Sequence, residues 1–157
     1  MFLATSKKYL APEGTLTGRF DSPHFTGSLT LKPMTVDLTV LGFIPAQINL
    51  GFSAAGAASG TYAGGTFTLN APMNFTVSSM TIFGFPFGGG SGCRTESPVQ
   101  LSISAPNSNV FDPANLAYLQ GGFTIASMNN QCGFLGGIVS GQLAGPGNTL
   151  GLLLQTV

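Results

Sequence analysis

Apolar and polar side chains alternate without a break from Thr66 to Val77. Successive side chains of a β-strand point to opposite faces of a sheet, so an alternation of this length predicts one long strand with one buried face. From Met80 the apolar residues take the opposite parity, which predicts a β-bulge at Ser78–Ser79. Pro72 has no N–H for a ladder hydrogen bond, and therefore predicts an edge position or a second bulge. The residues predicted to face the core are Phe67, Leu69, Ala71, Met73, Phe75 and Val77.

Shorter alternations, separated by Gly- and Pro-rich turns, recur along the chain. We expect an all-β fold, a β-sandwich or small β-barrel of about nine strands with one short helical turn. That helical turn is predicted at Pro113–Gln120, with Asp112 as its N-cap. We expect residues 1–12 to form an N-terminal arm and residues 13–157 a single domain. The other predicted strands are Thr15–Phe20, Phe25–Leu31, Met34–Val40, Ile48–Ser53, Val99–Ser104, Gly122–Ala126 and Thr149–Gln155.

Charged residues make up only 6% of the chain, and residues 38–93 and 113–157 contain none. Five cations are too few for a phosphate-binding patch, so we expect no nucleic-acid partner. A net charge of zero also gives weak repulsion between copies of the chain. This surface favours a protein held in an assembly, a wall or a membrane.

Two cysteines, Cys93 and Cys132, lie in segments typical of loops or strand ends. They lack the paired spacing of a zinc site, and the single histidine does not complete one, so we predict no metal and no cofactor. An even cysteine count in a chain of exported-type composition favours a Cys93–Cys132 disulfide over two buried thiols.

The last third of the chain carries the sequence Gly-Pro-Gly-Asn-Thr-Leu at 145–150, after Cys132-Gly133 and Ile138–Gly141. Together with Gly-Thr-Leu-Thr-Gly at 14–18, it resembles a group of secreted actinobacterial β-rich proteins of unknown function. The resemblance implies export and a β-rich fold, and it carries over no catalytic residue. We therefore expect an extracellular or cell-surface location, with the chain as the mature form, because no signal peptide is visible in its first residues.

Catalytic chemistry has few candidates here. His24 follows Asp21 by three residues across Ser22-Pro23, in what reads as a turn, and no serine lies in a nucleophile elbow. A turn histidine is the favoured interpretation over a general base. Arg94 and Glu96 suggest a local ion pair. A catalytic pair of carboxylates, as in glycosidases, is not favoured among the five carboxylates of the chain. We therefore predict no catalytic residue and no enzyme.

The segment Phe83-Gly84-Phe85-Pro86-Phe87 is the most unusual aromatic stretch, and Phe43 lies in a similar one. Two interpretations are open: core packing, or an exposed tip that contacts lipid or a neighbouring subunit. The composition favours a non-enzymatic exported domain that acts by association, as a self-assembling structural component of the cell surface. The alternatives are a membrane- or lipid-interacting protein (an oligomeric β-pore or a hydrophobic-ligand carrier) and an unrecognised hydrolase. The expected partners are copies of itself, with lipid or cell-wall material as alternatives.

Overall fold

The computed structural model describes residues 1–105, 117–134 and 136–154. Within them the chain forms twelve strands and one helix. The strands are β1 (Phe2–Leu3), β2 (Lys8–Tyr9), β3 (Gly14–Asp21), β4 (His24–Leu31), β5 (Met34–Val40), β6 (Ile44–Ala54), β7 (Ala58–Ala63), β8 (Thr66–Ile82), β9 (Phe85–Gly88), β10 (Val99–Ser104), β11 (Ala117–Ile125) and β12 (Gly145–Leu154), and the helix is α1 (Gly136–Leu143).

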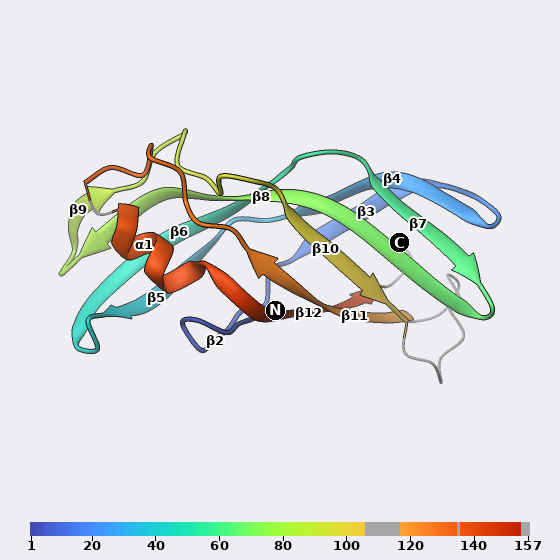
Figure 1. Cartoon of the computed structure of the whole chain (residues 1–157), viewed down its shortest axis with the longest axis horizontal. Helices are drawn as coiled ribbons and strands as arrows, with labels where there is room; N and C mark the ends of the chain where they lie inside the picture. Colours follow the sequence, from blue (N-terminus) through green and yellow to red (C-terminus); the bar gives the residue numbers. More distant parts are fainter. Residues whose placement is uncertain (106–116, 135, 155–157) are drawn as a thin grey trace.

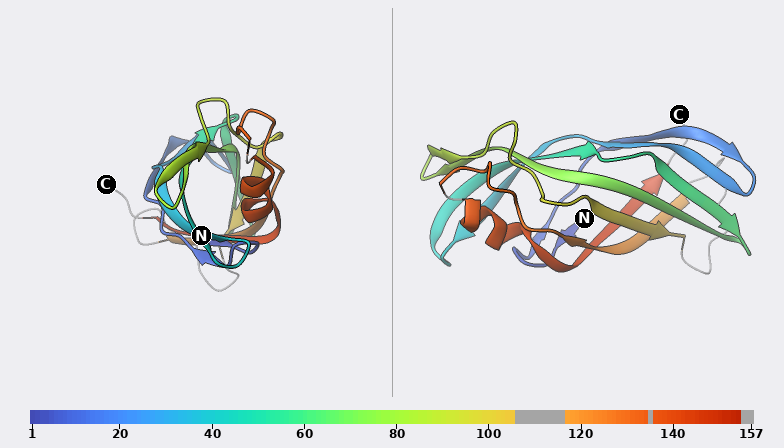
Figure 2. Two further views of the ribbon diagram at one scale, coloured as in Figure 1. Left: turned by 90° about the vertical axis from the view of Figure 1, so that its left-hand side faces the viewer. Right: turned by 45° about the horizontal axis from the view of Figure 1, so that its top comes forward.

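All twelve strands belong to one antiparallel sheet that curls into an open half-barrel (Figure 1). The view along the long axis in Figure 2 shows the strands surrounding a common interior. Nine strands follow one path in the order β2-β1-β12-β11-β10-β8-β7-β4-β3, while β5, β6 and β9 branch from β8. The predicted all-β class is confirmed, and its form is a curled single sheet.

β8 is the longest strand, and it is paired with β7 through its first half and with β6 through its second half. Pro72 lies between the last β7 pair and the first β6 pair, where its carbonyl accepts a hydrogen bond from the Ala55 amide at 2.9 Å. The proline therefore occupies a local break in the ladder of a central strand. The predicted bulge is also present, because Asn49 and Leu50 pair with Ser79 and Val77 and skip Ser78.

The interior of the half-barrel is filled by the inward residues of β8 and its neighbours. Phe67, Leu69, Phe75 and Val77 are all at most 1% exposed, which confirms the predicted facing of this strand. The Phe75 ring contacts Phe52 edge-on, with a centroid separation of 5.0 Å, and the centroid of the Phe123 ring is 5.8 Å from that of Phe75. Aromatic pairs of this kind contribute about 0.5–1.5 kcal/mol beyond the area they bury.

The predicted helix at Pro113–Gln120 is wrong where the structure describes it, because Ala117–Gln120 are strand residues of β11 paired with β12. Asp112 lies outside the described residues. The helix that does form is α1, whose buried Val139 and Leu143 pack it near β5 at one end of the half-barrel. No helix among the described residues has the length and apolar character to cross a membrane.

The N-terminal residues join the sheet, since Phe2 of β1 pairs with Thr149 of β12 and Leu3 is fully buried. A buried side chain, Asn148, holds this junction. Its Oδ1 accepts from the Ala4 amide at 2.9 Å, and its Nδ2 donates to the carbonyls of Gly145 and Phe123 at 2.7 and 3.3 Å. The N-terminal arm is therefore part of the half-barrel wall.

Candidate association surface

Large apolar side chains are exposed at the end of the molecule that carries α1 and β9. They come from the β5–β6 turn, the β8–β9 hairpin and the loop before α1, which lie at the same end of the molecule in Figure 1 and in the right-hand view of Figure 2. Their exposed fractions range from 44% to 92%. We call this set the aromatic end: Leu41, Phe43, Phe83, Phe85, Phe87 and Phe134. Of the two interpretations of the Phe83–Phe87 segment, the exposed tip is the one that forms.

The two hairpins of the aromatic end place bulky residues in an unfavourable backbone conformation. Leu41 has φ 53° and is followed by Gly42 at 82°, while Phe83 has φ 51° and is followed by Gly84 at 81°. Two successive positive φ angles are typical of a type I′ turn, which favours Asn-Gly, Asp-Gly or Gly-Gly. The β7–β8 hairpin follows that preference with Gly64 and Gly65 at 59° and 81°.

Hydrogen bonds and a disulfide fix these segments next to one another. The Phe83 amide donates to the Pro45 carbonyl at 3.2 Å, which joins the β8–β9 turn to the start of β6. The Gly89 amide donates to the Cys132 carbonyl at 3.1 Å, which joins the end of β9 to the Phe134 loop. The predicted Cys93–Cys132 disulfide is present, and both cysteines are buried.

Asn129 supports the same loop, and nothing in the sequence pattern singled it out. Its Nδ2 donates to the Gly92 carbonyl at 2.8 Å, and its Oδ1 accepts from the Gln131 amide at 3.2 Å. The Asn129 amide in turn donates to the Arg94 carbonyl at 2.8 Å. Side-chain to main-chain bonds of this type hold loops that have no ladder of their own.

The aromatic end lies in the uncharged part of the chain. All six of its residues fall within 38–93 and 113–157, the two stretches without a charged side chain. The ion pairs among the described residues, Arg19–Asp21 and Lys32–Glu13, belong to β3 and the segments beside it. Contact with an apolar partner at the aromatic end therefore requires no desolvation of a charge on these segments.

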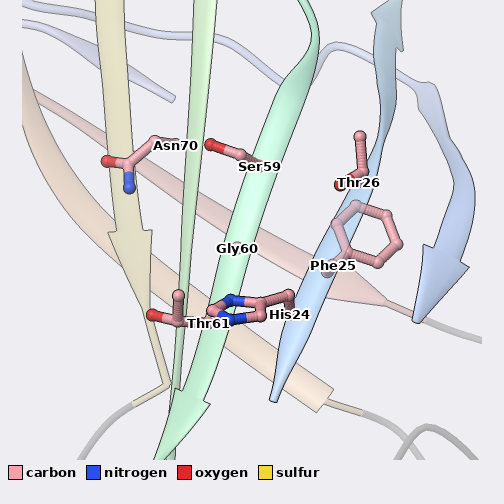
Figure 3. A pocket seen from close by; sticks show the side chains of 7 residues that line it. All are labelled: His24, Phe25, Thr26, Ser59, Gly60, Thr61 and Asn70. Carbon is pink, nitrogen blue, oxygen red and sulfur yellow. The ribbon is translucent and has the colours of Figure 1, made fainter. Parts of the chain in front are cut away.

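His24, the candidate base, begins β4 and lies opposite Asp21 in the β3–β4 ladder. Figure 3 shows it beside Thr61 on the outer face of the sheet, at a shallow pocket of about 230 Å³. Asp21 is bound by Arg19, with 3.0 Å between Nε and the carboxylate oxygen. The pocket is lined by His24, Phe25, Thr26, Ser59, Gly60, Thr61 and Asn70. Among the described residues, no hydrogen bond joins His24 to a serine or an acid, so no triad is assembled.

The described carboxylates are dispersed. The Glu13 Oε2 accepts from Lys32 Nζ at 2.7 Å, and this hydrogen bond and charge hold the pKa of Glu13 below its ordinary value of 4.5. Asp37 accepts from Gln47 at 2.9 Å. The ion pair expected between Arg94 and Glu96 is not formed. The Arg94 backbone amide donates a hydrogen bond to Asn129 Oδ1 at 3.4 Å, and the Glu96 backbone amide donates one to the Ser127 carbonyl at 2.8 Å. No group of three metal-binding side chains occurs among the residues described.

A groove of about 610 Å³ is the second concave feature, and it lies between β3 and β12. Sequence reasoning missed it, because the alternation predicts which residues face inward but not whether the first and last strands meet. The leucines that line it are Leu10, Leu16, Leu29, Leu31, Leu150, Leu152, Leu153 and Leu154.

Comparisons with known proteins give no relative for this chain: no family model, no curated protein and no solved structure matches it.

Proposed function

We propose that the protein is a non-enzymatic exported β-domain that acts by association, as a self-assembling structural component of the cell surface. The observation that carries the proposal is the aromatic end, where six large apolar side chains are exposed in an uncharged region. Isolated exposed apolar residues are ordinary on protein surfaces, whereas a cluster at one end of the molecule is not.

The size of the aromatic end supports a protein partner. At about 200 Å² for each large side chain, these exposed fractions add up to roughly 800 Å² over the three segments. One side of a standard protein interface is about 800 Å². Two aromatic ends related by a twofold axis would form a self-complementary contact that closes as a dimer.

A lipid surface is the second candidate, and the backbone of the two hairpins favours it. Leu41 and Phe83 lie at turn positions that normally hold Asn, Asp or Gly, and both side chains are mostly exposed there. Apolar residues at the tips of uncharged turns suit insertion between lipid head groups. Self-association and lipid contact would both use the aromatic end, with a second copy of the chain as the partner in the first and a membrane in the second.

Self-association and lipid contact are tested on the same variants, by measuring the molecular mass of the protein in solution and its binding to lipid vesicles. Analytical ultracentrifugation over a range of concentrations, without detergent, should give a dimer for the native chain. Phe85→Lys and Phe43→Lys should give monomers, because a lysine must be desolvated at the contact. Leu153→Lys, which replaces an exposed leucine on β12, is the matched control and should remain dimeric.

Co-sedimentation with phosphatidylcholine–phosphatidylglycerol vesicles separates the candidates. A monomeric native chain that binds vesicles through Phe43 and Phe85 would transfer the assignment to lipid contact. A monomer that binds neither its copies nor vesicles would reject association through this surface.

A further inference from the structure

The path from β3 to β12 contains an odd number of strands: β3, β4, β7, β8, β10, β11 and β12. Each neighbouring pair on this path is antiparallel, so β3 and β12 run in the same direction. An all-antiparallel barrel needs an even number of strands, because its first and last strands must also run in opposite directions. β3 and β12 therefore do not close an all-antiparallel barrel by pairing with each other.

Both strands expose an unpaired edge toward the groove between them. No described strand pairs with the outer edge of β3, and beyond Thr149 none pairs with the corresponding edge of β12. Backbone N–H and C=O groups along such an edge are free to bond an added strand. The floor of the groove is apolar, with Leu16 and Leu29 on one side and Leu150 and Leu152 on the other.

β1 marks where an added strand would lie. It is antiparallel to β12 through the pair Phe2–Thr149, and Met1 lines the groove. β1 pairs with one edge of β12 at Thr149, and along the same edge no described strand lies beside Leu150–Leu154. A strand there would run antiparallel to both β12 and β3 and would be the eighth strand of the path.

We propose that the groove between β3 and β12 is a binding site for one extended peptide segment with alternate apolar side chains. The segment binds antiparallel to both strands and closes an eight-stranded barrel, a size whose interior side chains just fill. Its inward apolar residues contact Leu16, Leu29, Leu150 and Leu152, and its backbone pairs with both edges, as in strand addition to an exposed sheet.

A peptide fits the groove better than an acyl chain does. An acyl chain would cover the leucines but would leave two rows of backbone donors and acceptors without partners. Glu13 and Lys32, which line the groove, bind each other at 2.7 Å, and the Met1 ammonium group, which also lines it, donates to the Leu10 carbonyl at 2.9 Å. The site is separate from the aromatic end, and either assignment can fail without the other.

The probe is a capped synthetic peptide with the sequence of residues 24–31, because β4 already pairs antiparallel with β3 and directs its alternate apolar residues inward. NMR-detected amide exchange should show slower exchange along both Gly14–Asp21 and Leu150–Leu154 when the peptide is added. The matched control is the same peptide with alternate backbone nitrogens methylated, which keeps the apolar side chains and removes the donors. Binding of the control with equal affinity would overturn the proposal.

Substitutions in the groove provide a second test of peptide binding. Leu152 lines the groove, whereas Thr30 is exposed between Leu29 and Leu31 on β4 and does not line it. Leu152→Lys should weaken peptide binding by at least about tenfold, because the lysine must be desolvated. Thr30→Lys should change it by less than about twofold. Equal effects of the two substitutions would contradict the inward site, and circular dichroism checks that both variants fold.

A tethered strand keeps the proposal falsifiable if the free peptide binds weakly. The same eight residues are joined ahead of Met1 through one glycine, which preserves the inward parity set by the Phe2–Thr149 pair. Tethering raises the effective concentration to about the millimolar range. The extended chain should melt at a higher temperature and should protect both edges from exchange. If neither free nor tethered strand protects both edges, or if dodecanoate binds the groove and excludes the peptide, the proposal is wrong.

Discussion

Leu41 and Phe83 occupy backbone positions that ordinary side chains avoid. A left-handed conformation costs a residue with a Cβ about 1–2 kcal/mol, and neither side chain offsets that cost by burial, since both are mostly exposed. The same turn in the β7–β8 hairpin uses Gly64 and Gly65. Lys7, outside the aromatic end, has a similar φ of 54°, so what distinguishes Leu41 and Phe83 is that a costly turn conformation coincides with an exposed apolar side chain.

Replacing these residues with the one the turn prefers should separate stability from association. Leu41→Asn and Phe83→Asn should each raise the free energy of unfolding by roughly 1 kcal/mol, and both should weaken dimerisation. Gly64→Asn, in the matched turn, should change neither quantity appreciably. Urea unfolding and ultracentrifugation measure the two effects, and a stabilised variant that still associates normally would exclude that side chain from the contact.

The Lys32–Glu13 pair predicts a measurable shift at the rim of the groove. The ammonium group of Lys32 holds the pKa of the Glu13 carboxyl below 4.5, so this carboxylate contributes stability above its ordinary pKa. That contribution disappears as the pH falls through the lowered pKa, and it is small because the pair is exposed. NMR titration should give a Glu13 pKa below 4.5, and Lys32→Ala should raise it toward 4.5. A native value at or above 4.5 would show that the pair is broken in solution.

At the scale of elements, residue alternation located most of the strands and the bulge at Ser78. It missed β7, where Gly60 and the small residues around it give no alternation, although Gly60 is needed because a Cβ there would meet the Phe67 ring at 2.8 Å. It also placed a helix on Ala117–Gln120, where pairing with β12 decides the conformation. Residue alternation along the sequence indicates which face of a strand each side chain is on. Whether a segment becomes helix or strand is decided by its pairing with distant strands.

The junction held by Asn148 is another contact between distant segments that local sequence did not reveal. Asn148→Ala would leave the Ala4 amide and the carbonyl of Phe123 without their side-chain partner inside the protein. We expect a loss of about 1–3 kcal/mol in the free energy of unfolding. Asn70→Ala, on the exposed outer face of β8, is the control and should cost less than about 0.5 kcal/mol. Similar losses in both variants in urea unfolding would reject the junction.

Over the whole molecule, the described residues present the exposed aromatic end, the groove between β3 and β12 and a shallow pocket beside His24. The aromatic end was partly predictable, because Phe43, Phe83, Phe85 and Phe87 stand out in sequence, but Leu41 and Phe134 join it only through the fold. The open edges of β3 and β12 depend on the strand count of the finished sheet. Under this account His24→Ala and Asp21→Ala leave association unchanged, since both residues lie on the β3–β4 hairpin and outside the aromatic end.

If copies of the chain meet through the aromatic end, the solvent accessibility of its backbone amides should fall as the protein concentration rises. A soluble paramagnetic agent relaxes exposed amides, so the amides of residues 41–43, 83–85 and 87 should become protected as the protein concentration rises. Over the same range, amides of Gly14–Asp21 and of Leu153 should keep their relaxation rates. Two results would contradict association through the aromatic end. One is protection that develops first along β3, and the other is a doubling of the measured mass with no change at residues 41–43, 83–85 and 87.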